Sequence, residues 1–337
     1  MSQAFRIVIP MAGLGSRMRP HTWVRPKPLL PLAGKTVLDH ALDQFSSLPD
    51  LDQAEYVFII SPNQGDLIQR HMREKHPDKR VHFVLQEEMR GQSDALWLAR
   101  EYLDGPMLMA FSDTLLETDL TFLSEESADV VAWVKPVEDP RRFGVIEINQ
   151  QGWATRLIEK PTDLANNLVL VGFYYFRDGK SLVKAIETQM ERGKSLKGEY
   201  FLADAINIMI ETGSKIRKQQ VDIWLDAGIP EAILETNRYL WDHQRCGSET
   251  PLPWEGVTFI PPVYVAPDVN LESSVIGPHV SIARGCSLSR AVVRNSILDE
   301  GSNIQDMIIE DSLVGRNVTL HGKPEHLNIG DNSQVKH

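Results

Sequence analysis

Cysteine is scarce in this sequence, and no hydrophobic stretch is long. The two cysteines among its 337 residues, Cys246 and Cys286, form no disulfide framework and show no metal-ligand spacing. The longest apolar runs, such as residues 168–176, stop far short of the ~20 residues that a membrane-spanning helix needs. The first residues also lack the pattern of a signal peptide. These absences predict a cytoplasmic protein with no membrane partner.

Basic residues are in the minority. The chain has 35 lysines and arginines against 46 aspartates and glutamates, and its net charge is −11. A nucleic-acid-binding surface normally needs a basic face, so we expect no nucleic-acid partner. Yet no carboxylate precedes Asp39, and the same stretch contains six cations: Arg6, Arg17, Arg19, Arg25, Lys27 and Lys35. Such a local cluster predicts a pocket for small anions.

Short apolar runs alternate with helical patterns up to about residue 240. Predicted strands cover residues 5–10, 55–61, 81–86, 107–113, 129–137, 144–149 and 168–176. Predicted helices cover residues 36–45, 91–103, 181–193 and 200–213. This alternation predicts a Rossmann-like α/β domain with a mostly parallel mixed sheet over residues 1–242. Such sheets bind ligands at the carboxyl ends of their strands, where the first loop begins.

The pattern changes after residue 242. Residues 243–257 lose periodicity and gain Pro, Gly and Ser, as expected of a linker. Residues 258–337 then repeat apolar residues at six-residue steps, with the step shortened by one between 275 and 280 and between 292 and 297. The first two series are Val263, Val269, Val275, Val280, Cys286 and Val292. This period predicts a short left-handed parallel β-helix; ordinary β-hairpins are the alternative.

A glycine-rich loop, residues 10–18, follows the first predicted strand. It does not match the dinucleotide-binding pattern G-x-G-x-x-G, because Met18 occupies the position of the third glycine. The later stretch A-G-K-T does not match the P-loop pattern, because Leu29 stands where that pattern has a glycine. What remains is a loop whose glycines, Gly13 and Gly15, allow backbone N–H groups to approach phosphate oxygens. A tight turn with solvated cations is the alternative, but the density of cations favours phosphate binding.

The stretches P-M-A-G-L-G-S-R-M-R-P and R-P-K-P-L-L-P-L resemble the signature of sugar-phosphate nucleotidylyltransferases. The resemblance spans about the first 240 residues and is strongest to glucose-1-phosphate thymidylyl- and uridylyltransferases with a hexapeptide-repeat tail. It implies a Mg²⁺-dependent enzyme that joins a nucleoside monophosphate from a nucleoside triphosphate to a sugar 1-phosphate and releases pyrophosphate. dTTP and glucose 1-phosphate are the expected substrates, with a UTP–glucose or a GTP–mannose enzyme as alternatives.

The resemblance also implies roles for individual residues. Arg17 would hold the leaving end of the triphosphate and Lys27 the oxygens near the reacting phosphorus, as two catalytic cations. Asp113 and Asp226, each after an apolar run, would carry the magnesium. One departure is Ser112, which stands where the family usually has glycine. The nucleotide would also contact the first loop at Ala12, Gly13, Gly15 and Ser16.

Further motifs imply contacts to the base and the sugar. Gln86 stands five residues before Gly91, as a glutamine does in the thymidylyl relatives. Its amide could both donate to and accept from the edge shared by thymine and uracil, so it would not distinguish these bases. The expected contacts to the sugar and its phosphate are Gly144, Glu159, Lys160, Asn167, Gly172 and Glu199.

Other classes of function stay open. A regulatory subunit that binds nucleotide sugars without catalysis would not need both aspartates, and a hexapeptide acyltransferase would use a histidine base on a longer β-helix. The histidines show neither H-x-x-x-H nor Cys–His ligand spacing, so no histidine metal site is expected. We expect the tail to serve assembly or regulation and the chain to form a homo-oligomer.

Overall fold

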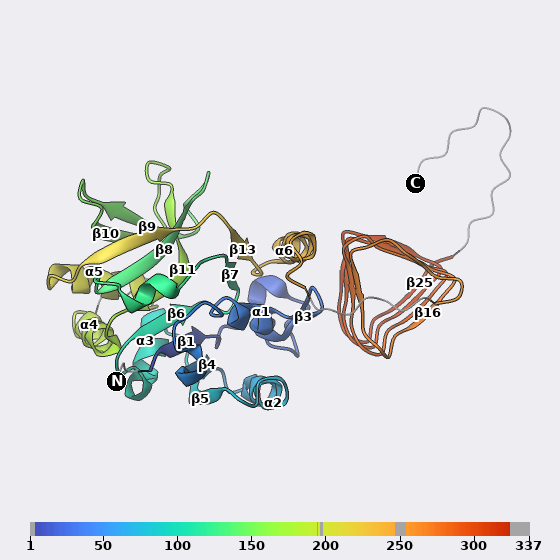
Figure 1. The fold of residues 1–337 in the computed structure, drawn as a ribbon, viewed down its shortest axis with the longest axis horizontal. Helices are drawn as coiled ribbons and strands as arrows, with labels where there is room; N and C mark the ends of the chain where they lie inside the picture. The colour runs from blue at the N-terminus through green and yellow to red at the C-terminus, as the bar shows by residue number, and fades with distance from the viewer. Residues whose placement is uncertain (1–3, 194, 196–197, 247–253, 324–337) are drawn as a thin grey trace. The chain divides into compact units, whose positions relative to one another are not determined.

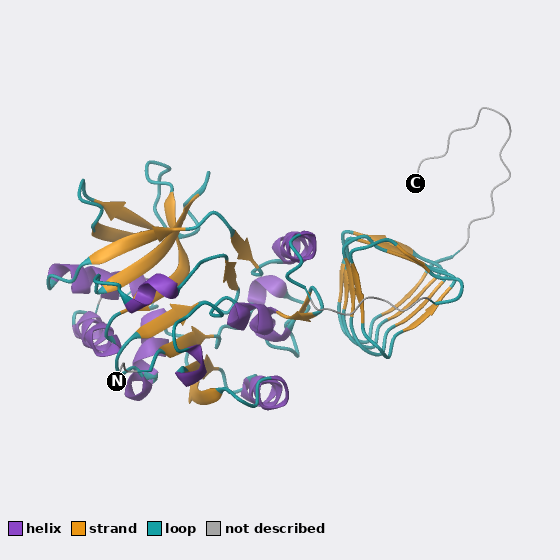
Figure 2. Ribbon diagram, in the orientation of Figure 1, coloured by secondary structure: helices purple, strands orange, loops and turns teal. Residues whose placement is uncertain are grey.

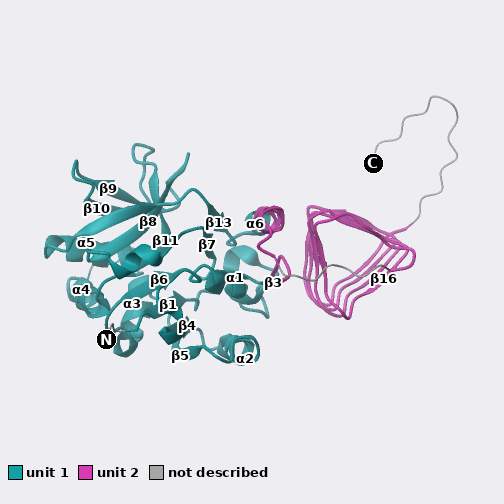
Figure 3. Ribbon diagram, viewed as in Figure 1, with its two compact units in different colours: residues 1–30, 36–233 teal, residues 31–35, 234–337 magenta. Residues whose placement is uncertain are grey.

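The computed structural model of the protein describes residues 4–193, 195, 198–246 and 254–323. The chain divides into two compact units, coloured separately in Figure 3. The first comprises residues 1–30 and 36–233, and the second comprises residues 31–35 and 234–337. The division falls inside helix α6, Pro230–Asp242, whereas the sequence-based boundary lies at the end of this helix. Residues 247–253 of the expected linker and 324–337 of the expected tail lie outside the described part.

A mixed β-sheet forms the centre of the first unit (Figure 1, Figure 2). Its strands follow the spatial order β10-β9-β11-β6-β1-β4-β5, and β8 pairs with β11 and β12. Strands β6, β1, β4 and β5 are parallel, as are β8 and β12, whereas β9, β10 and β11 pair antiparallel. The bounds are β1 Arg6–Pro10, β4 Glu55–Ile60, β5 Arg80–Leu85, β6 Met107–Ala110, β8 Val130–Pro136, β9 Gly144–Ile148, β10 Ala154–Glu159, β11 Leu168–Phe176 and β12 Ile216–Gln220. The predicted Rossmann-like α/β fold is confirmed.

Helices cover both faces of this sheet. Val8 of β1 packs among side chains of α3, α4 and α5, whereas its neighbours Ile7 and Ile9 pack among those of α1 and α2. Burial on both faces explains the nearly continuous apolar runs of the central strands. The bounds are α1 Val37–Asp43, α2 Gly65–Lys75, α3 Gln92–Leu98, α4 Gly179–Glu191 and α5 Leu202–Glu211, with 3₁₀ turns at Ser16–Met18 (η1), Lys27–Leu29 (η2), Leu51–Gln53 (η3), Arg100–Tyr102 (η4) and Thr121–Ser124 (η5). In the described part of the chain, no helix is long and apolar enough to cross a membrane.

A separate two-stranded ladder joins distant parts of the first unit. Strand β7, Thr114–Leu116, pairs antiparallel with β13, Trp224–Asp226. The register sets Asp226 opposite Thr114, the residue after Asp113. This pairing brings together two segments that lie far apart along the sequence.

The second unit contains three parallel four-stranded sheets around a triangular core (Figure 1). Thr258 pairs with Val275, Val275 with Val292, and Val292 with Ile308, so one coil takes 16 or 17 residues. The coil is shorter than three full hexapeptides, in line with the shortened steps in the sequence. The predicted left-handed parallel β-helix is confirmed. Its sheets are β14 Thr258–Phe259, β17 Val275–Ile276, β20 Val292–Arg294 and β23 Ile308–Glu310; β15 Val263–Val265, β18 Val280–Ile282, β21 Ile297–Leu298 and β24 Leu313–Val314; and β16 Asn270–Glu272, β19 Ser287–Ser289, β22 Asn303–Gln305 and β25 Thr319–His321.

Buried polar contacts fix the end of α6 to the β-helix within the second unit. Asn237 Oδ1 accepts hydrogen bonds from the Ala33 N–H and from Ser281 Oγ, both at 3.0 Å. Trp241 Nε1 donates to the same Ser281 hydroxyl at 3.3 Å. Ala33 lies between the short strands β2, Pro31–Leu32, and β3, Lys35–Thr36. The helix end, this short segment and the first coils therefore pack as one body.

Candidate active site

The glycine-rich loop begins where β1 ends, at the carboxyl ends of the parallel strands. Gly15 has φ 59° and precedes η1, and its carbonyl accepts a hydrogen bond from Thr22 Oγ1 at 2.8 Å. A Cβ at position 15 would lie 3.1 Å from the Thr22 side chain, whereas a Cβ at Gly13 would meet nothing within 4 Å. The loop is therefore held at Gly15 and open at Gly13, where its backbone can approach a ligand.

Two of the six clustered cations, Arg17 and Lys27, line a cavity of about 600 Å³ beside this loop. Lys27 lies in the η2 turn, and its largely buried ammonium group contacts Asp113 Oδ2. Arg6 instead pairs with Glu55, at 3.3 Å. Carboxylates from distant segments thus compensate cations that have no carboxylate near them in the sequence.

Asp113 and Asp226 reach the same part of the cavity through the β7–β13 ladder. The Gly228 N–H donates to Asp226 Oδ1 at 2.7 Å. Burial raises the pKa of Asp226, and the charge of Asp113 raises it further, while Lys27 opposes the rise. Two carboxylates therefore stand near one ammonium group, an arrangement that can hold a cation or position one beside a phosphate.

Gln86 follows β5 and is buried in the cavity wall. Its amide nitrogen donates to Asp94 Oδ2 at 3.0 Å and to the Gly91 carbonyl at 3.3 Å, and Arg90 binds the other oxygen of Asp94 at 2.9 Å. Because an ionised carboxylate only accepts hydrogen bonds, the amide nitrogen must face Asp94. Both amide hydrogens are thus engaged, which leaves the oxygen for a ligand, whereas the sequence predicted an amide that could also donate.

Another part of the cavity wall is built by the antiparallel pair β9–β10, which sets Gly144 opposite Glu159. A Cβ at position 144 would lie 3.1 Å from Glu159 Oε2, so the glycine leaves room for the carboxylate. Burial raises the pKa of Glu159, and the charge of Lys160 partly opposes this rise. Gly172 has φ 80°, and the ring of Phe111 occupies the space that a side chain at position 172 would need.

The cavity unites most of the residues predicted from the sequence: Ala12, Gly13, Gly15, Ser16, Arg17, Lys27, Gln86, Gly91, Asp113, Gly144, Glu159, Gly172, Glu199 and Asp226. Lys160 and Asn167 are not among the described residues of its wall. Lys160 has φ 50°, and its ammonium lies 4.9 Å from the ring centre of Phe201. Asn167 is exposed, and its carbonyl accepts the Val137 N–H at 3.0 Å.

Two further cavity residues, Arg142 and Trp224, were not predicted. The buried indole Nε1 of Trp224 has no hydrogen-bond partner in the described part of the chain, and the ring packs edge-on against Phe143 at 5.2 Å. Residues two apart on a strand share a face, so the position of Trp224 two residues before Asp226 was a usable signal. Arg142 stands two residues before Gly144, a predicted contact to the sugar.

Comparison with known proteins identifies a family and several relatives. A family profile described as nucleotidyl transferase matches residues 7–243. The low-salt glycan biosynthesis nucleotidyltransferase Agl11 of Haloferax volcanii is 29% identical over 98% of this chain and 99% of its own length. The UTP–glucose-1-phosphate uridylyltransferase AglF of the same organism is 30% identical over 72% of this chain and 99% of its own length.

A solved structure shares the fold of much of this chain. The nucleoside-diphosphate-sugar pyrophosphorylase of Vibrio cholerae RC9 aligns with a TM-score of 0.60 and 20% identity, over 69% of this chain and 99% of that chain. The profile match covers well over half of the sequence and includes the glycine-rich loop, Lys27 and both aspartates of the cavity. The chain therefore belongs to the nucleotidyl transferase family.

Proposed function

We propose that this protein transfers a nucleoside monophosphate from a nucleoside triphosphate to a sugar 1-phosphate, giving a nucleotide sugar and pyrophosphate. The observation that carries the proposal is the cavity in which Asp113 and Asp226 stand near Lys27 beside a glycine-rich loop. In-line attack of a phosphate oxygen on the α-phosphorus brings two polyanions together, so the enzyme must align them and offset their repulsion.

Arg17 and Lys27 have distinct tasks in this reaction. Arg17 binds the end of the triphosphate that departs as pyrophosphate. Lys27 binds oxygens at the reacting phosphorus, where negative charge develops in the transition state. Because Lys27 already contacts Asp113, its ammonium is held near the reacting groups before the substrates arrive. Backbone N–H groups around Gly13 add a second set of phosphate donors.

The residues of the site fit Mg²⁺. Asp113 and Asp226 are hard oxygen donors, and they are close enough for the charge of one to raise the pKa of the other. Mg²⁺ bound there supplies positive charge to the phosphates and orients them. The pair also supports an enzyme over a regulatory subunit, since binding a nucleotide sugar alone does not require both carboxylates.

The proposed base is thymine or uracil. Gln86 Oε1 accepts the N3–H of either base, whereas cytosine offers an acceptor at that position. The sequence resemblance favours dTTP with glucose 1-phosphate. UTP is the second candidate, because the relative AglF is named a uridylyltransferase. The sugar contacts are Gly144, Glu159, Gly172 and Glu199, while Lys160 and Asn167 stay predictions from the sequence alone.

Pyrophosphate release in the presence of Mg²⁺ tests the proposal. The substrates are dTTP, UTP, GTP, CTP and ATP, each combined with the 1-phosphates of glucose, galactose, mannose and N-acetylglucosamine. Activity confined to dTTP or UTP with one or two sugars supports it. Silence in every combination, with nucleotide sugar still bound, would establish the regulatory subunit instead.

A further inference from the structure

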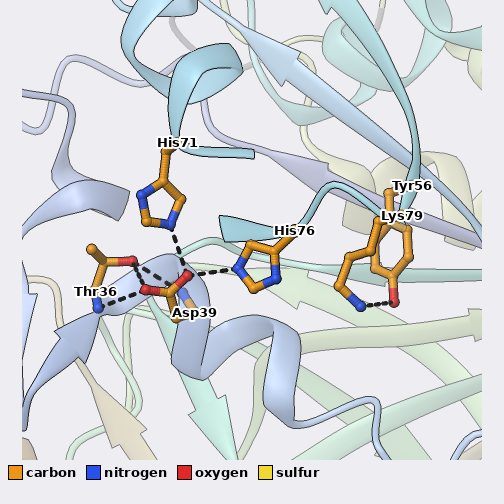
Figure 4. Close-up of polar contacts among 6 residues, drawn as sticks. All are labelled: Thr36, Asp39, Tyr56, His71, His76 and Lys79. Atoms are coloured by element: carbon orange, nitrogen blue, oxygen red, sulfur yellow. Dashed lines mark hydrogen bonds and ion pairs between the residues drawn. The ribbon is translucent and has the colours of Figure 1, made fainter. Parts of the chain in front are cut away.

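Two histidines and one aspartate converge outside the cavity described above. The Nε2 atoms of His71 and His76 each lie 2.7 Å from Asp39 Oδ1. The ligand atoms of the three residues all lie within 4.8 Å of one another. Figure 4 shows both imidazole rings directed at the same carboxylate. None of the three is among the described residues that line the cavity, so the proposed reaction does not account for them.

The end of a helix brings the two histidines together. In a continuous α-helix, side chains five positions apart diverge by about 140°. Helix α2 ends at Lys75, and His76 leaves the helical conformation with φ −134° and ψ 51°. Its N–H still donates to the Met72 carbonyl at 2.9 Å, which keeps the residue against the helix end. The turn thus directs His76 toward the carboxylate that His71 reaches from within the helix.

Asp39 is held from its other side by its own helix. The N–H and Oγ1 of Thr36 donate to Asp39 Oδ2 at 2.9 and 2.7 Å, in the capping box that begins α1. Oδ1 is therefore the oxygen directed at the histidines. Metal-binding side chains commonly have such outer hydrogen bonds, which fix their orientation.

The three side chains are largely shielded, with exposed fractions of 16% for Asp39, 13% for His71 and 20% for His76. Burial acts to raise the pKa of Asp39, but hydrogen bonds from both histidines outweigh it and hold that pKa well below its ordinary range. Lys79, which Figure 4 also draws, has a different partner, because it donates to the Tyr56 hydroxyl at 3.1 Å. The cluster therefore combines one negative charge with two imidazoles.

We propose that Asp39, His71 and His76 form a binding site for a dication of the Zn²⁺ type, separate from the proposed Mg²⁺ site. Two imidazoles and a carboxylate suit Zn²⁺, Co²⁺ or Ni²⁺ and leave one tetrahedral position for water. With metal–ligand bonds of about 2.0–2.1 Å, ligand atoms lie about 3.3 Å apart. The 2.7 Å contacts must therefore open by about 0.6 Å, a shift that side-chain rotation allows.

Metal binding needs an unprotonated Nε2 on each histidine. Each histidine carries its proton on Nε2 when it donates to Asp39, and on Nδ1 when Nε2 binds a metal. A neutral imidazole therefore changes tautomer when its Nε2 binds the ion. The ion replaces both hydrogen bonds and joins the start of α1 to the end of α2.

Zn²⁺ titration of the full chain, freed of metal with a chelator, tests this site. The titration is made with excess Mg²⁺ present and is read by competition with a chromophoric zinc indicator. The wild type should bind one more Zn²⁺ than His71→Gln or His76→Gln, or bind it at least tenfold more tightly. Co²⁺ should give visible absorption bands in the wild type that both variants lose.

His82→Gln is the matched control, because His82 Nε2 lies 2.9 Å from Glu55 Oε2 but has no second imidazole beside it in the described chain. It should bind Zn²⁺ like the wild type. Equal Zn²⁺ binding by the wild type and both folded cluster variants would overturn the proposal. If a variant unfolds, ¹⁵N-histidine resonances of the wild type decide, since Zn²⁺ must shift those of His71 and His76. None of these results depends on nucleotide turnover.

Discussion

At the scale of single residues, the orientation of Gln86 depends on Asp94. In Asp94→Asn, the side chain at position 94 that faces the Gln86 amide can donate a hydrogen bond as well as accept one. Gln86 can then turn its nitrogen toward the cavity, where it suits the acceptor N3 of cytosine. We expect the ratio of kcat/KM for the preferred pyrimidine nucleotide over CTP to fall about tenfold, the effect of one misdirected buried hydrogen bond. Initial-rate kinetics with each nucleotide measure this ratio.

Arg90→Met is the control for this substitution. It removes the other partner of Asp94 and leaves the carboxylate that orients Gln86. The nucleotide ratio should therefore stay as in the wild type. An unchanged ratio in Asp94→Asn, or the same fall in both variants, would contradict the role given to Asp94.

Asp113→Asn and Asp226→Asn test the carboxylate pair. Each substitution removes one negative charge and changes the volume of the side chain little, so we expect turnover to fall by at least about a hundredfold. The melting temperature of Asp226→Asn should not fall, because the burial and the repulsion that raise the pKa of Asp226 act on its charged form. Pyrophosphate release and thermal unfolding give the two readouts, with Asp119→Asn on an exposed turn as control. Wild-type rates in either variant would refute the proposed metal ligands.

Glu159 predicts a pH-dependent stability. Its pKa is raised, so the folded chain loses stability as pH increases from the ordinary glutamate pKa through the raised one. Below the ordinary pKa the carboxyl is neutral in both states, and this loss is absent. The melting temperature of Glu159→Gln should therefore rise relative to that of the wild type as the pH increases above the ordinary glutamate pKa. A difference that does not vary with pH would contradict this account.

Most cavity residues could be predicted because short motifs at strand ends carry them. Their partners could not, because partners come from distant segments. No pattern near Lys27 indicates its contact with Asp113, and none near Arg6 indicates Glu55. Lys160 shows the converse limit, since its motif is intact but it is not among the described residues of the cavity wall.

At the scale of elements, helix α3 begins against the backbone of residue 200. Gly91 has φ 101°, and a Cβ there would lie 2.5 Å from the Tyr200 carbonyl oxygen. Gly91→Ala should destabilise the fold by roughly 2–3 kcal/mol, since left-handed strain adds to overlap with backbone atoms. Urea unfolding measures the change. Gly152→Ala, with φ 86° and nothing within 4 Å, should lose only about 1–2 kcal/mol, and equal losses would contradict the packing argument.

Elements with long apolar runs were predicted, and those with polar faces were not. Strands β10 and β12 each pair with one neighbour, and polar or charged residues interrupt their apolar pattern. Helix α2 buries only Gly65, Ile68 and Met72, too few to define a helical period. Since α2 carries His71, missing this helix also meant missing the histidine cluster.

At the scale of the whole molecule, we expect the repeat tail to join chains. Stacked coils bury their core against one another, and the outermost strands of such a stack leave backbone groups unpaired at their edges. Light scattering should show an oligomer for the full chain and a smaller species for a chain that ends at residue 257. A monomer in both cases would contradict this expectation.

The coil length of the β-helix bears on how this tail can change in evolution. Val292 stacks on Val275, and Ile308 stacks on Val292. Removal of one whole coil would therefore leave every remaining strand in the sheet to which it already belongs. Removal of a single hexapeptide would instead move every later strand to the next side of the triangle. Gene segments that encode complete coils are thus the natural units of gain and loss, and descendants can differ in tail length while each remaining coil keeps its sequence.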